Sequence, residues 1–549
     1  MIQQIKAQSR KAIITACLLA ISSYAYAEDS ASAPSAPKFA IQSYKIVGNT
    51  LLSEAELSQA YAPYIGANKD FSDIQHALEK IQDIYLSRGY SSVQVSLPEQ
   101  ELENGEVTLE VKEQTLVNVT IEGAEHHDDE NILASLPAIK AGELPNSKAI
   151  ARNLKLANEN PSKQTVVLFK NNEDDAGVDA TIKVVDEKPW KAFGTIDNSG
   201  TQQTGYTRLG FGFQHYNVLN SDHRFSGQFV TNSPTDKDMF DVKIFGFGYS
   251  IPLYDLGDSL DFTLGYSDVN AGTTNLPGTG AGIAVTGRGV VAGAKYNHNF
   301  NKIANYQHRL SFGLDYRAYR NQIDLVGFGG AVSLQEPVTA SPFSLTYAGI
   351  WQADEQVLAF SISDVVNVPF TSHSSADTYT TYAADRNFSK VLYSADYSRP
   401  LPLLENWRIR FGVSGQRTDD HLIAGEQFGA GGMDSVRGFR DRVVAGDKGY
   451  RWVAEAISPD FGKIIGDSVA LRGVLFYEGA HTANEHDING NSSSDINIAS
   501  VGGGLRLVYA KDFFARMDYA MVVDGDKTAT TGTRKEGDLY MHVSAGWIW

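Results

Sequence analysis

The residues whose chemistry and arrangement most strongly suggest a function lie in one stretch of the sequence, the segment 421–449. It contains the run Ser435-Val436-Arg437-Gly438-Phe439, in which a cation stands between an apolar residue and a glycine-aromatic pair. External loops without a role are usually polar, so this composition predicts a buried loop. A buried arginine requires an acidic partner, and the run Phe476-Tyr477-Glu478-Gly479-Ala480 offers Glu478. Because alternate residues of a strand share a face, Phe476 and Glu478 are expected to face the loop together.

A barrel wall would surround such a loop, and the sequence from Pro189 to Trp549 predicts one. Apolar and polar residues alternate there, as in Trp407-Arg408-Ile409-Arg410-Phe411. Charges facing inward and aromatic residues facing outward are typical of a β-barrel in lipid, where only a closed barrel satisfies every backbone group. The arginines expected to line and hydrate the lumen are Arg309, Arg317, Arg408, Arg410 and Arg516. An equally good interpretation of any one of them is a lumen-filling salt bridge, with Asp315 or Asp518 as its partner.

Turn signals divide this region into sixteen antiparallel strands, an even number as bacterial transmembrane barrels have. The strands are expected to begin near residues 190, 206, 223, 238, 259, 287, 307, 342, 356, 388, 405, 450, 468, 497, 512 and 537. Tight turns such as Asn220-Ser221-Asp222 alternate with long connections such as 421–449. Since short turns are periplasmic and long loops external in such barrels, both chain ends are expected on the periplasmic side.

The composition excludes two broad classes of protein. The 549 residues include 47 Lys and Arg against 65 Asp and Glu, a formal net charge of −18, and so acidic a chain is unsuited to binding nucleic acid. No apolar stretch beyond the N-terminus approaches the ~18 residues that a membrane-spanning helix needs, which excludes a polytopic helical protein. The 50 glycines, 26 tyrosines and 26 phenylalanines favour aromatic-rich β-structure.

The N-terminus predicts export from the cytoplasm. Basic residues precede an apolar run, and Ala25-Tyr26-Ala27 provides small residues at a cleavage position, which indicates a signal peptide over residues 1–27. Cys17, the only cysteine, lies in a loose match to a lipoprotein box, so lipidation is the weaker alternative. The mature chain would then lack disulfides. Residues 28–38, rich in alanine, serine and proline, are expected to form a flexible linker.

Two copies of one small α+β pattern follow the linker. In residues 39–114 a strand precedes a helix that opens with the capping box of Ser53 and Glu56, then come a second helix from about Ser72 and two strands. The order β-α-α-β-β recurs in residues 115–188. Exposed edge strands of such small sheets can accept an extended peptide as an added strand. The pattern therefore favours binding modules over inert spacers.

Several short patterns suggest chemistry that their context does not support. Gly257-Asp258-Ser259-Leu260 spells a lipase nucleophile block but falls on a tight turn. His126-His127-Asp128-Asp129-Glu130 could bind a metal, yet it precedes a helix, where acids favour the helix dipole. Asp487-Ile488-Asn489-Gly490-Asn491 begins like a calcium loop but lacks its later glycine and glutamate. We expect no catalytic residue, no metal and no cofactor.

The sequence resembles the TpsB transporters of two-partner secretion, which are the haemolysin and adhesin secretion-activation proteins. The resemblance rests on Val436-Arg437-Gly438-Phe439 after Gly431-Gly432, Gly446-Asp447 with Gly449-Tyr450, Asp197-Asn198-Ser199-Gly200 with Thr204-Gly205, and Arg88-Gly89-Tyr90 with Leu97-Pro98-Glu99-Gln100. It implies two periplasmic POTRA modules over 39–114 and 115–188. It also implies a sixteen-stranded outer-membrane barrel over 189–549, with loop 421–449 inserted in the lumen and Arg437 anchored to the thirteenth strand.

By this resemblance the POTRA modules recognise an unfolded exoprotein, and the barrel secretes it through its pore. The implied partners are a large β-helical exoprotein of the TpsA type, outer-membrane lipid and the barrel-assembly machinery that inserts the chain. The protein is expected to act as a monomer with porin activity. Whether the exoprotein is a cytolysin, an adhesin, a growth-inhibition toxin or a haem binder is left open.

Two features depart from the family pattern. The family's Phe-x-Asp-x-Gly element ends here in Glu478-Gly479-Ala480, so the carboxylate is one methylene longer and the last glycine is lost. Many members also carry a plug helix at the N-terminus, whereas residues 28–38 are too few for a helix that spans a pore. We therefore expect a leakier resting pore, or one that is closed by external loops alone.

Three other functions fit the sequence less well. A barrel-assembly insertase usually has three or five POTRA modules rather than two. A passive porin would leave residues 39–187 unexplained. An outer-membrane hydrolase would need a nucleophile with its base, and the sequence suggests no such set.

Overall fold

The computed structural model describes residues 37–102, 104–174, 177–201, 204–236, 241–269, 273–275, 282–284, 287–320, 337–402, 404–485, 495–525 and 535–549. The expected signal peptide, most of the linker and the calcium-like run at 487–491 lie outside these residues. The chain has two compact units, which we describe separately. The first ends at Glu113, and the second contains Arg88–Ser92 and everything from Gln114 onward.

The first unit contains a three-stranded sheet and two helices. Strand β5 (Glu106–Glu113) lies between β2 (Ser43–Val47), to which it is parallel, and β4 (Val93–Ser96), to which it is antiparallel. Helix α2 (Glu54–Tyr61) begins with the predicted capping box, since both of its reciprocal hydrogen bonds are present, and α3 spans Phe71–Arg88. These two predicted helices are confirmed.

The same unit also has a short ribbon that the sequence did not predict. Strand β1 (Phe39–Ile41) pairs antiparallel with β3 (Gly66–Lys69), and a 3-10 turn, η1 (Ala62–Tyr64), precedes β3. Such short strands carry too few residues for the alternation of apolar and polar side chains to be visible.

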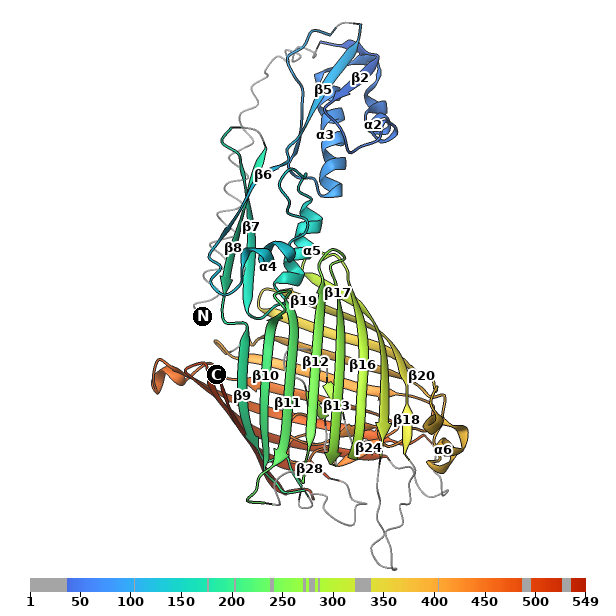
Figure 1. Cartoon of the computed structure of the whole chain (residues 1–549), viewed down its shortest axis with the longest axis vertical. Coiled ribbons are helices and arrows are strands. Elements are labelled where there is room, and N and C mark those ends of the chain that lie inside the picture. Colours follow the sequence, from blue (N-terminus) through green and yellow to red (C-terminus); the bar gives the residue numbers. More distant parts are fainter. Residues whose placement is uncertain are drawn as a thin grey trace, which may run out of the picture. The chain divides into compact units, whose positions relative to one another are not determined.

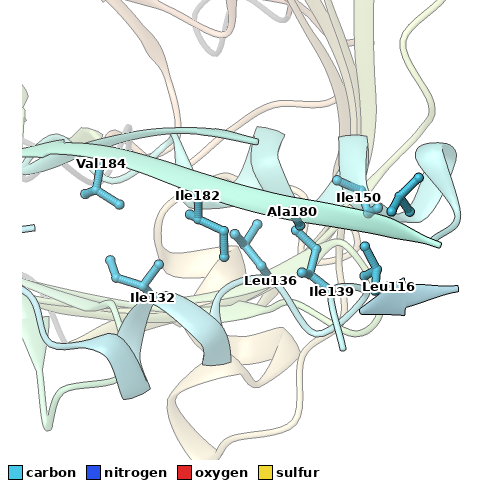
Figure 2. Packing of buried hydrophobic residues seen from close by; sticks show 9 residues of the cluster. Leu116, Ile132, Leu136, Ile139, Ile150, Ala180, Ile182 and Val184 are labelled. Atoms are coloured by element: carbon cyan, nitrogen blue, oxygen red, sulfur yellow. The ribbon is translucent and has the colours of Figure 1, made fainter. Parts of the chain in front are cut away.

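The second unit starts with a module of the same element order. Strand β8 (Val178–Asp186) lies between β6 (Leu116–Glu122) and β7 (Lys163–Asn171), and the helices are α4 (Asp129–Ala134) and α5 (Ser147–Ala157). The predicted recurrence of β-α-α-β-β is confirmed. Figure 2 shows its apolar core between β8 and the helices, with Leu116, Ile132, Leu136, Ile139, Ile150, Ala180, Ile182 and Val184.

The rest of the unit is a closed antiparallel barrel (Figure 1). Its strands are β9 (Trp190–Asp197), β10 (Arg208–Val218), β11 (His223–Asn232), β12 (Ile244–Leu253), β13 (Asp258–Val269), β16 (Gly287–Asn299), β17 (Tyr306–Tyr319), β18 (Val338–Ala340), β19 (Pro342–Ala353), β20 (Gln356–Asn367), β21 (Ser389–Pro400), β22 (Arg408–Arg417), β25 (Lys448–Ile457), β26 (Val469–Ala483), β27 (Ile496–Tyr509), β28 (Phe513–Asp524) and β29 (Leu539–Ile548). Both β18 and β19 pair with β17, so they form one wall strand. The wall of the described chain therefore has sixteen strands, as predicted, and β29 closes it against β9.

Smaller elements decorate the two ends of the barrel. They are β14 (Thr273–Asn275), β15 (Gly282–Ala284), η2 (Ser372–Ser374), α6 (Ala376–Thr381) and η3 (Gly462–Ile464). The predicted tight turn at 220–222 is present, with Asn220 and Asp222 at positive φ. The fourth barrel strand begins at Ile244 rather than near residue 238.

The barrel wall alternates as its sequence predicts. On β10 and β12 the outward Phe211, Phe213, Phe245 and Phe247 are exposed, whereas Arg208 on β10 is buried on the inner face. An apolar exterior suits lipid because the hydrocarbon core cannot form hydrogen bonds with polar side chains. None of the helices in the described ranges combines the length and the hydropathy that a membrane-spanning helix needs.

We predict that Ile182→Ala destabilises the second module. Ile182 is 0 % exposed, and truncating a buried isoleucine leaves a cavity that costs about 2–5 kcal/mol. The measurement is the urea concentration at which a short protease pulse cleaves this module in the full chain. Val185→Ala on the same strand is the control, since Val185 is 76 % exposed. Equal urea midpoints for the two variants would contradict the core assignment.

Candidate functional site

The segment 421–449 enters the barrel as a hairpin. Its stem pairs β23 (Phe428–Ala430) with β24 (Val444–Gly446), and we call the residues between these strands, 431–443, the tip. The tip contains Gly431, Gly432 and Gly438 at φ values of +111°, +107° and +91°. A Cβ at Gly432 would lie 1.9 Å from Oδ1 of Asp441, so only glycine fits there.

Arg437 is the centre of the tip's contact with the wall, and its residue is only 3 % exposed. Its Nε and Nη2 donate to the two carboxylate oxygens of Glu478 at 2.9 and 2.7 Å. The Arg437 backbone N–H also donates to Glu478. Nη2 donates to Glu455 at 2.8 Å, and Nη1 lies 3.6 Å from Asp518 Oδ1. One loop cation thus meets three acids, from β26, β25 and β28.

Apolar contacts surround this ion cluster. The Arg437 guanidinium carbon lies 3.5 Å from the ring centroid of Phe476, a cation–π arrangement. Val436 and Phe439 are 0 % exposed and pack in one cluster with Ala480. Both changed residues of the Phe-x-Asp-x-Gly element therefore face the loop: Glu478 binds the guanidinium through both oxygens, and the methyl group of Ala480 joins the apolar contact.

Three further wall residues contact the tip, and of these the sequence singled out only Arg516, as a lumen arginine. Arg516 donates to Asp434 Oδ1 at 2.6 Å, Arg451 donates to the Asp434 carbonyl at 2.6 Å, and the Gly438 N–H donates to His542 Nε2 at 3.1 Å. Alternation places Arg451 and His542 on the inner face, but no sequence signal pairs them with residues of a distant loop.

The five arginines expected in the lumen have different surroundings. Arg410 pairs with Asp396 and Glu455 at 2.7 and 3.0 Å, and Arg516 pairs with Asp518 at 2.6 Å. Arg317 pairs with Asp315 at 2.6 Å and with Glu426, Arg408 donates to the Glu355 carbonyl at 2.7 Å, and Arg309 lines a lumen cavity. Salt bridges thus fill part of the lumen, as the alternative interpretation proposed.

The lumen retains a cavity of about 760 Å³ beside the tip. Tip residues Met433, Asp434, Ser435 and Arg437 line it, together with wall residues that include Arg309. Glu455 and Glu478, the acids that hold Arg437, line the same cavity.

The patterns that were set aside on sequence grounds have structural roles. Gly257 adopts a φ of +76° in its turn, and Ser259 accepts a hydrogen bond from Asn297 at 3.1 Å. His127 lies 3.0 Å from Asp186 through Nδ1. Within the described ranges, no group of His, Cys, Asp and Glu side chains is arranged to hold a metal ion.

The structure does bring together one Ser-His-Asp set, which the sequence did not suggest. Nε2 of His127 lies 3.3 Å from Ser162 Oγ while its Nδ1 faces Asp186. Ser162 is only 1 % exposed, and its hydroxyl also donates to Asn160 at 2.9 Å. Because a substrate cannot reach this hydroxyl, the set acts as internal hydrogen bonding within the second module.

Two protein-family models together match most of the chain. The model described as haemolysin secretion/activation protein ShlB/FhaC/HecB matches residues 177–471, and the model for a ShlB-type POTRA domain matches residues 39–114. The chain is 24 % identical over 416 residues to the outer membrane transporter CdiB of Escherichia coli, covering 75 % of this chain and 68 % of that protein. It is 20 % identical over 500 residues to the heme/hemopexin transporter protein HuxB of Haemophilus influenzae, covering 89 % and 84 %.

Solved structures show the same fold. The structure of CdiB from Escherichia coli matches with a TM-score of 0.73 at 19 % identity, covering 96 % of this chain and 93 % of the other. The structure of BamA from Haemophilus ducreyi lacking POTRA domains 1–3 matches with a TM-score of 0.50 at 16 % identity, covering 93 % and 100 %. At these identities the likeness concerns the fold alone.

Asp441 in the tip lies near two other carboxylates, those of Asp197 and Asp434, and its protonation should make the conductance of the pore depend on pH. Burial first, and then the charges of Asp197 and Asp434, raise the pKa of Asp441 to about 7. We call the loop seated when its tip lies in the lumen, as it does here. Because the pKa of Asp441 is raised in the seated loop, its contribution to the stability of the seated loop is greatest at low pH and is lost as the pH rises through about 7. We therefore expect the pore to conduct better at pH 8 than at pH 5.

The measurement is single-channel conductance of the purified chain in a planar bilayer. The asparagine of Asp441→Asn is uncharged at every pH, so this variant should lose the pH dependence of the conductance. The control Asp419→Asn changes an exposed residue and should keep that pH dependence. A pH profile that Asp441→Asn leaves intact would refute the role of Asp441.

Proposed function

The chain belongs to the TpsB family, the haemolysin secretion/activation proteins of the ShlB/FhaC/HecB type, and we propose that the tip of its loop 421–449 gates its pore. The protein is an outer-membrane transporter that secretes a partner exoprotein, with its N-terminal POTRA region in the periplasm. The observation that carries the proposal is the position of Arg437, a loop residue buried inside the barrel between Glu478 and Glu455.

Electrostatics makes such a contact suitable for a gate. Charge-assisted hydrogen bonds contribute about 1.5–3 kcal/mol each, so the tip is held firmly but reversibly. Water can replace these bonds once the tip moves, because the tip already borders the lumen cavity. An unfolded chain can then pass through a lumen whose remaining charges are solvated.

The periplasmic modules are proposed to receive the exoprotein. We assign residues 39–114 and 115–188 to two POTRA modules and residues 189–549 to the barrel. Strand β7 is an edge of the second sheet. Asn158 covers both backbone groups of Thr165 on this edge, accepting from its N–H at 2.7 Å and donating to its carbonyl at 2.9 Å.

The outward side of β7 continues beyond Thr165. Since the backbone N–H and C=O groups of alternate residues point to the same side of a strand, the N–H groups of Val167 and Phe169 also point away from β8. Val166, Leu168 and Phe169 are exposed around them. A client strand could therefore pair with β7 and place apolar side chains on this surface.

The remaining features of the proposal are those that membership of the family implies. The client is a large β-helical exoprotein of the TpsA type, the chain acts as a monomer without a cofactor, and it is not an enzyme. The barrel-assembly machinery inserts it into the membrane. A barrel-assembly insertase is the second candidate, favoured by the fold shared with BamA, and the next experiment separates the two.

We expect Arg437→Ala to cripple secretion while the barrel still assembles. The substitution strands buried acids without their cation, a loss of about 3–5 kcal/mol in the seated loop. Secreted proteins are compared between cells with the gene intact, deleted, or complemented by the wild type or by Arg437→Ala. Loss of one large protein upon deletion supports secretion, whereas a joint decline of many outer-membrane proteins supports the insertase.

Heat-modifiable migration in gels reports whether each variant is assembled. Arg408→Ala is the matched control, because Arg408 bonds a turn carbonyl away from the tip. Normal export by Arg437→Ala would eliminate the proposed gate.

We expect Phe169→Pro to reduce secretion through loss of one edge donor. Proline lacks the N–H that faces a client strand but leaves the pairing of β7 with β8 intact. Phe169→Ala keeps this N–H and serves as the control for the lost ring. The readout is the amount of the same exoprotein in the medium. If both variants secrete equally, strand addition at β7 is not the mode of recognition.

A further inference from the structure

The loop is attached to the wall at a second place, its root, which we define as residues 421–427. Glu426 in the root is only 2 % exposed. Its carboxylate accepts two hydrogen bonds from Arg317 at 3.0 and 2.9 Å, one from Lys390 at 2.8 Å and one from Tyr319 at 2.8 Å. These partners stand on β17 and β21, whereas the acids that hold Arg437 stand on β25, β26 and β28.

The backbone of the root is held as well. Lys390 Nζ and Gln416 Nε2 donate to the Glu426 carbonyl at 2.8 and 3.0 Å, and Gln416 also donates to the Asp447 carbonyl at 2.8 Å. The Asp447 carboxylate accepts from the Leu422 N–H at 2.9 Å and from Gln427 at 3.0 Å. The two ends of the loop are therefore tied to each other and to β21 and β22.

A small apolar core covers the root. Leu422 and Ile423 are each 2 % exposed, and they share a cluster with Tyr319, Val338, Ala340, Tyr379 and Phe388. Tyr379 belongs to α6, so another external connection packs on the root. The root thus packs against wall residues through an apolar core, whereas the tip borders the lumen cavity.

Hydrogen-bond satisfaction distinguishes the two attachments. Each carboxylate oxygen of Glu426 accepts two hydrogen bonds. At the tip, by contrast, Arg437 Nη1 and the nearby His542 Nδ1 are buried without a hydrogen-bond partner in the described structure. Withdrawing the root would leave Lys390 without an acidic partner and Arg317 with Asp315 alone. Withdrawing the tip exposes an unsatisfied guanidinium nitrogen to water.

The charge of Glu426 is secure over a wide pH range. Burial alone would raise the pKa of this carboxyl, but the Arg317 and Lys390 cations overcome that effect and lower it to about 2. The contacts of the carboxylate therefore persist at any pH at which the cells grow, and only strong acid would weaken them.

We propose that Glu426 is a positioning residue that keeps the root on the wall while the tip leaves the lumen. The loop then opens as a flap that pivots about its β23–β24 stem and does not depart as a whole. The inference rests on the proposed gating role of the tip, but retention of the root can be measured without any secretion. Unlike Arg437, Glu426 is thus expected to hold the part of the loop that does not move.

The test uses two cysteine reporters at buried positions, Ile423→Cys in the root and Val436→Cys in the tip. Cys17 is the only native cysteine and precedes the expected cleavage point. Intact cells are labelled with a membrane-impermeant maleimide. In an Arg437→Ala background, the tip reporter should label at least about one hundred-fold faster while the root reporter stays protected, because the substitution removes the cation from all its buried acidic partners.

Glu426→Gln preserves shape and removes the charge, and it should accelerate labelling of the root reporter by roughly ten-fold. Glu426→Asp should restore part of the protection. Glu485→Gln, which alters an acid paired with Lys448, should leave both reporters at wild-type rates. If Glu426→Gln does not assemble, Glu426→Gln with Lys390→Met removes one stranded cation and should still expose the root reporter.

Two results would overturn the inference. Root and tip reporters that label together in Arg437→Ala would mean that the loop leaves as one body. A root reporter that remains protected in assembled Glu426→Gln would mean that Glu426 does not hold it. Both results are read on resting cells, so they are distinct from a failure to find a secreted client, which would instead count against the proposed function.

Discussion

A guanidinium removed from water must be given acidic partners, and the inserted loop depends on how this barrel meets that constraint at Arg437. Desolvation of the ion is offset only if several hydrogen bonds are well placed. Here the two oxygens of Glu478 are placed for this, with Glu455 and Asp518 nearby. The wall strands must therefore keep the register that brings these acids to one level, and the glycines of the tip must allow the chain to turn beneath them.

The same constraint shapes the rest of the lumen. Barrel strands expose half of their residues to the interior, and an interior that carries charge must be either hydrated or internally paired. This barrel does both, since Arg410 and Arg516 are paired with acids while Arg309 borders the cavity. A passage of this kind offers few apolar surfaces to which an unfolded polypeptide would stick. Such a lumen suits the transport of an extended chain.

Two attachments of unequal character give the loop a direction of movement. The root combines a fully bonded carboxylate with an apolar core, and the tip combines a strong ion cluster with unsatisfied polar atoms beside open volume. Local stability follows buried contacts and satisfied hydrogen bonds, so the tip is the weaker of the two. Strong and weak regions within one loop allow it to move and yet return to the same place.

The sequence alone predicts the strand count, the in-out alternation, the repeated β-α-α-β-β module and the pairing of Arg437 with Glu478, because these rest on local periodicity and on a family motif. The ribbon of β1 and β3 escaped it, since such short strands carry no visible alternation. The three-dimensional structure was needed to show that Glu455 and Asp518 join Arg437, that His542 accepts a hydrogen bond from Gly438, that Arg317 binds Glu426, and that Ser162 contacts His127. These contacts join residues that are distant in sequence. Their partners depend on strand register and loop path, which no single stretch of sequence encodes.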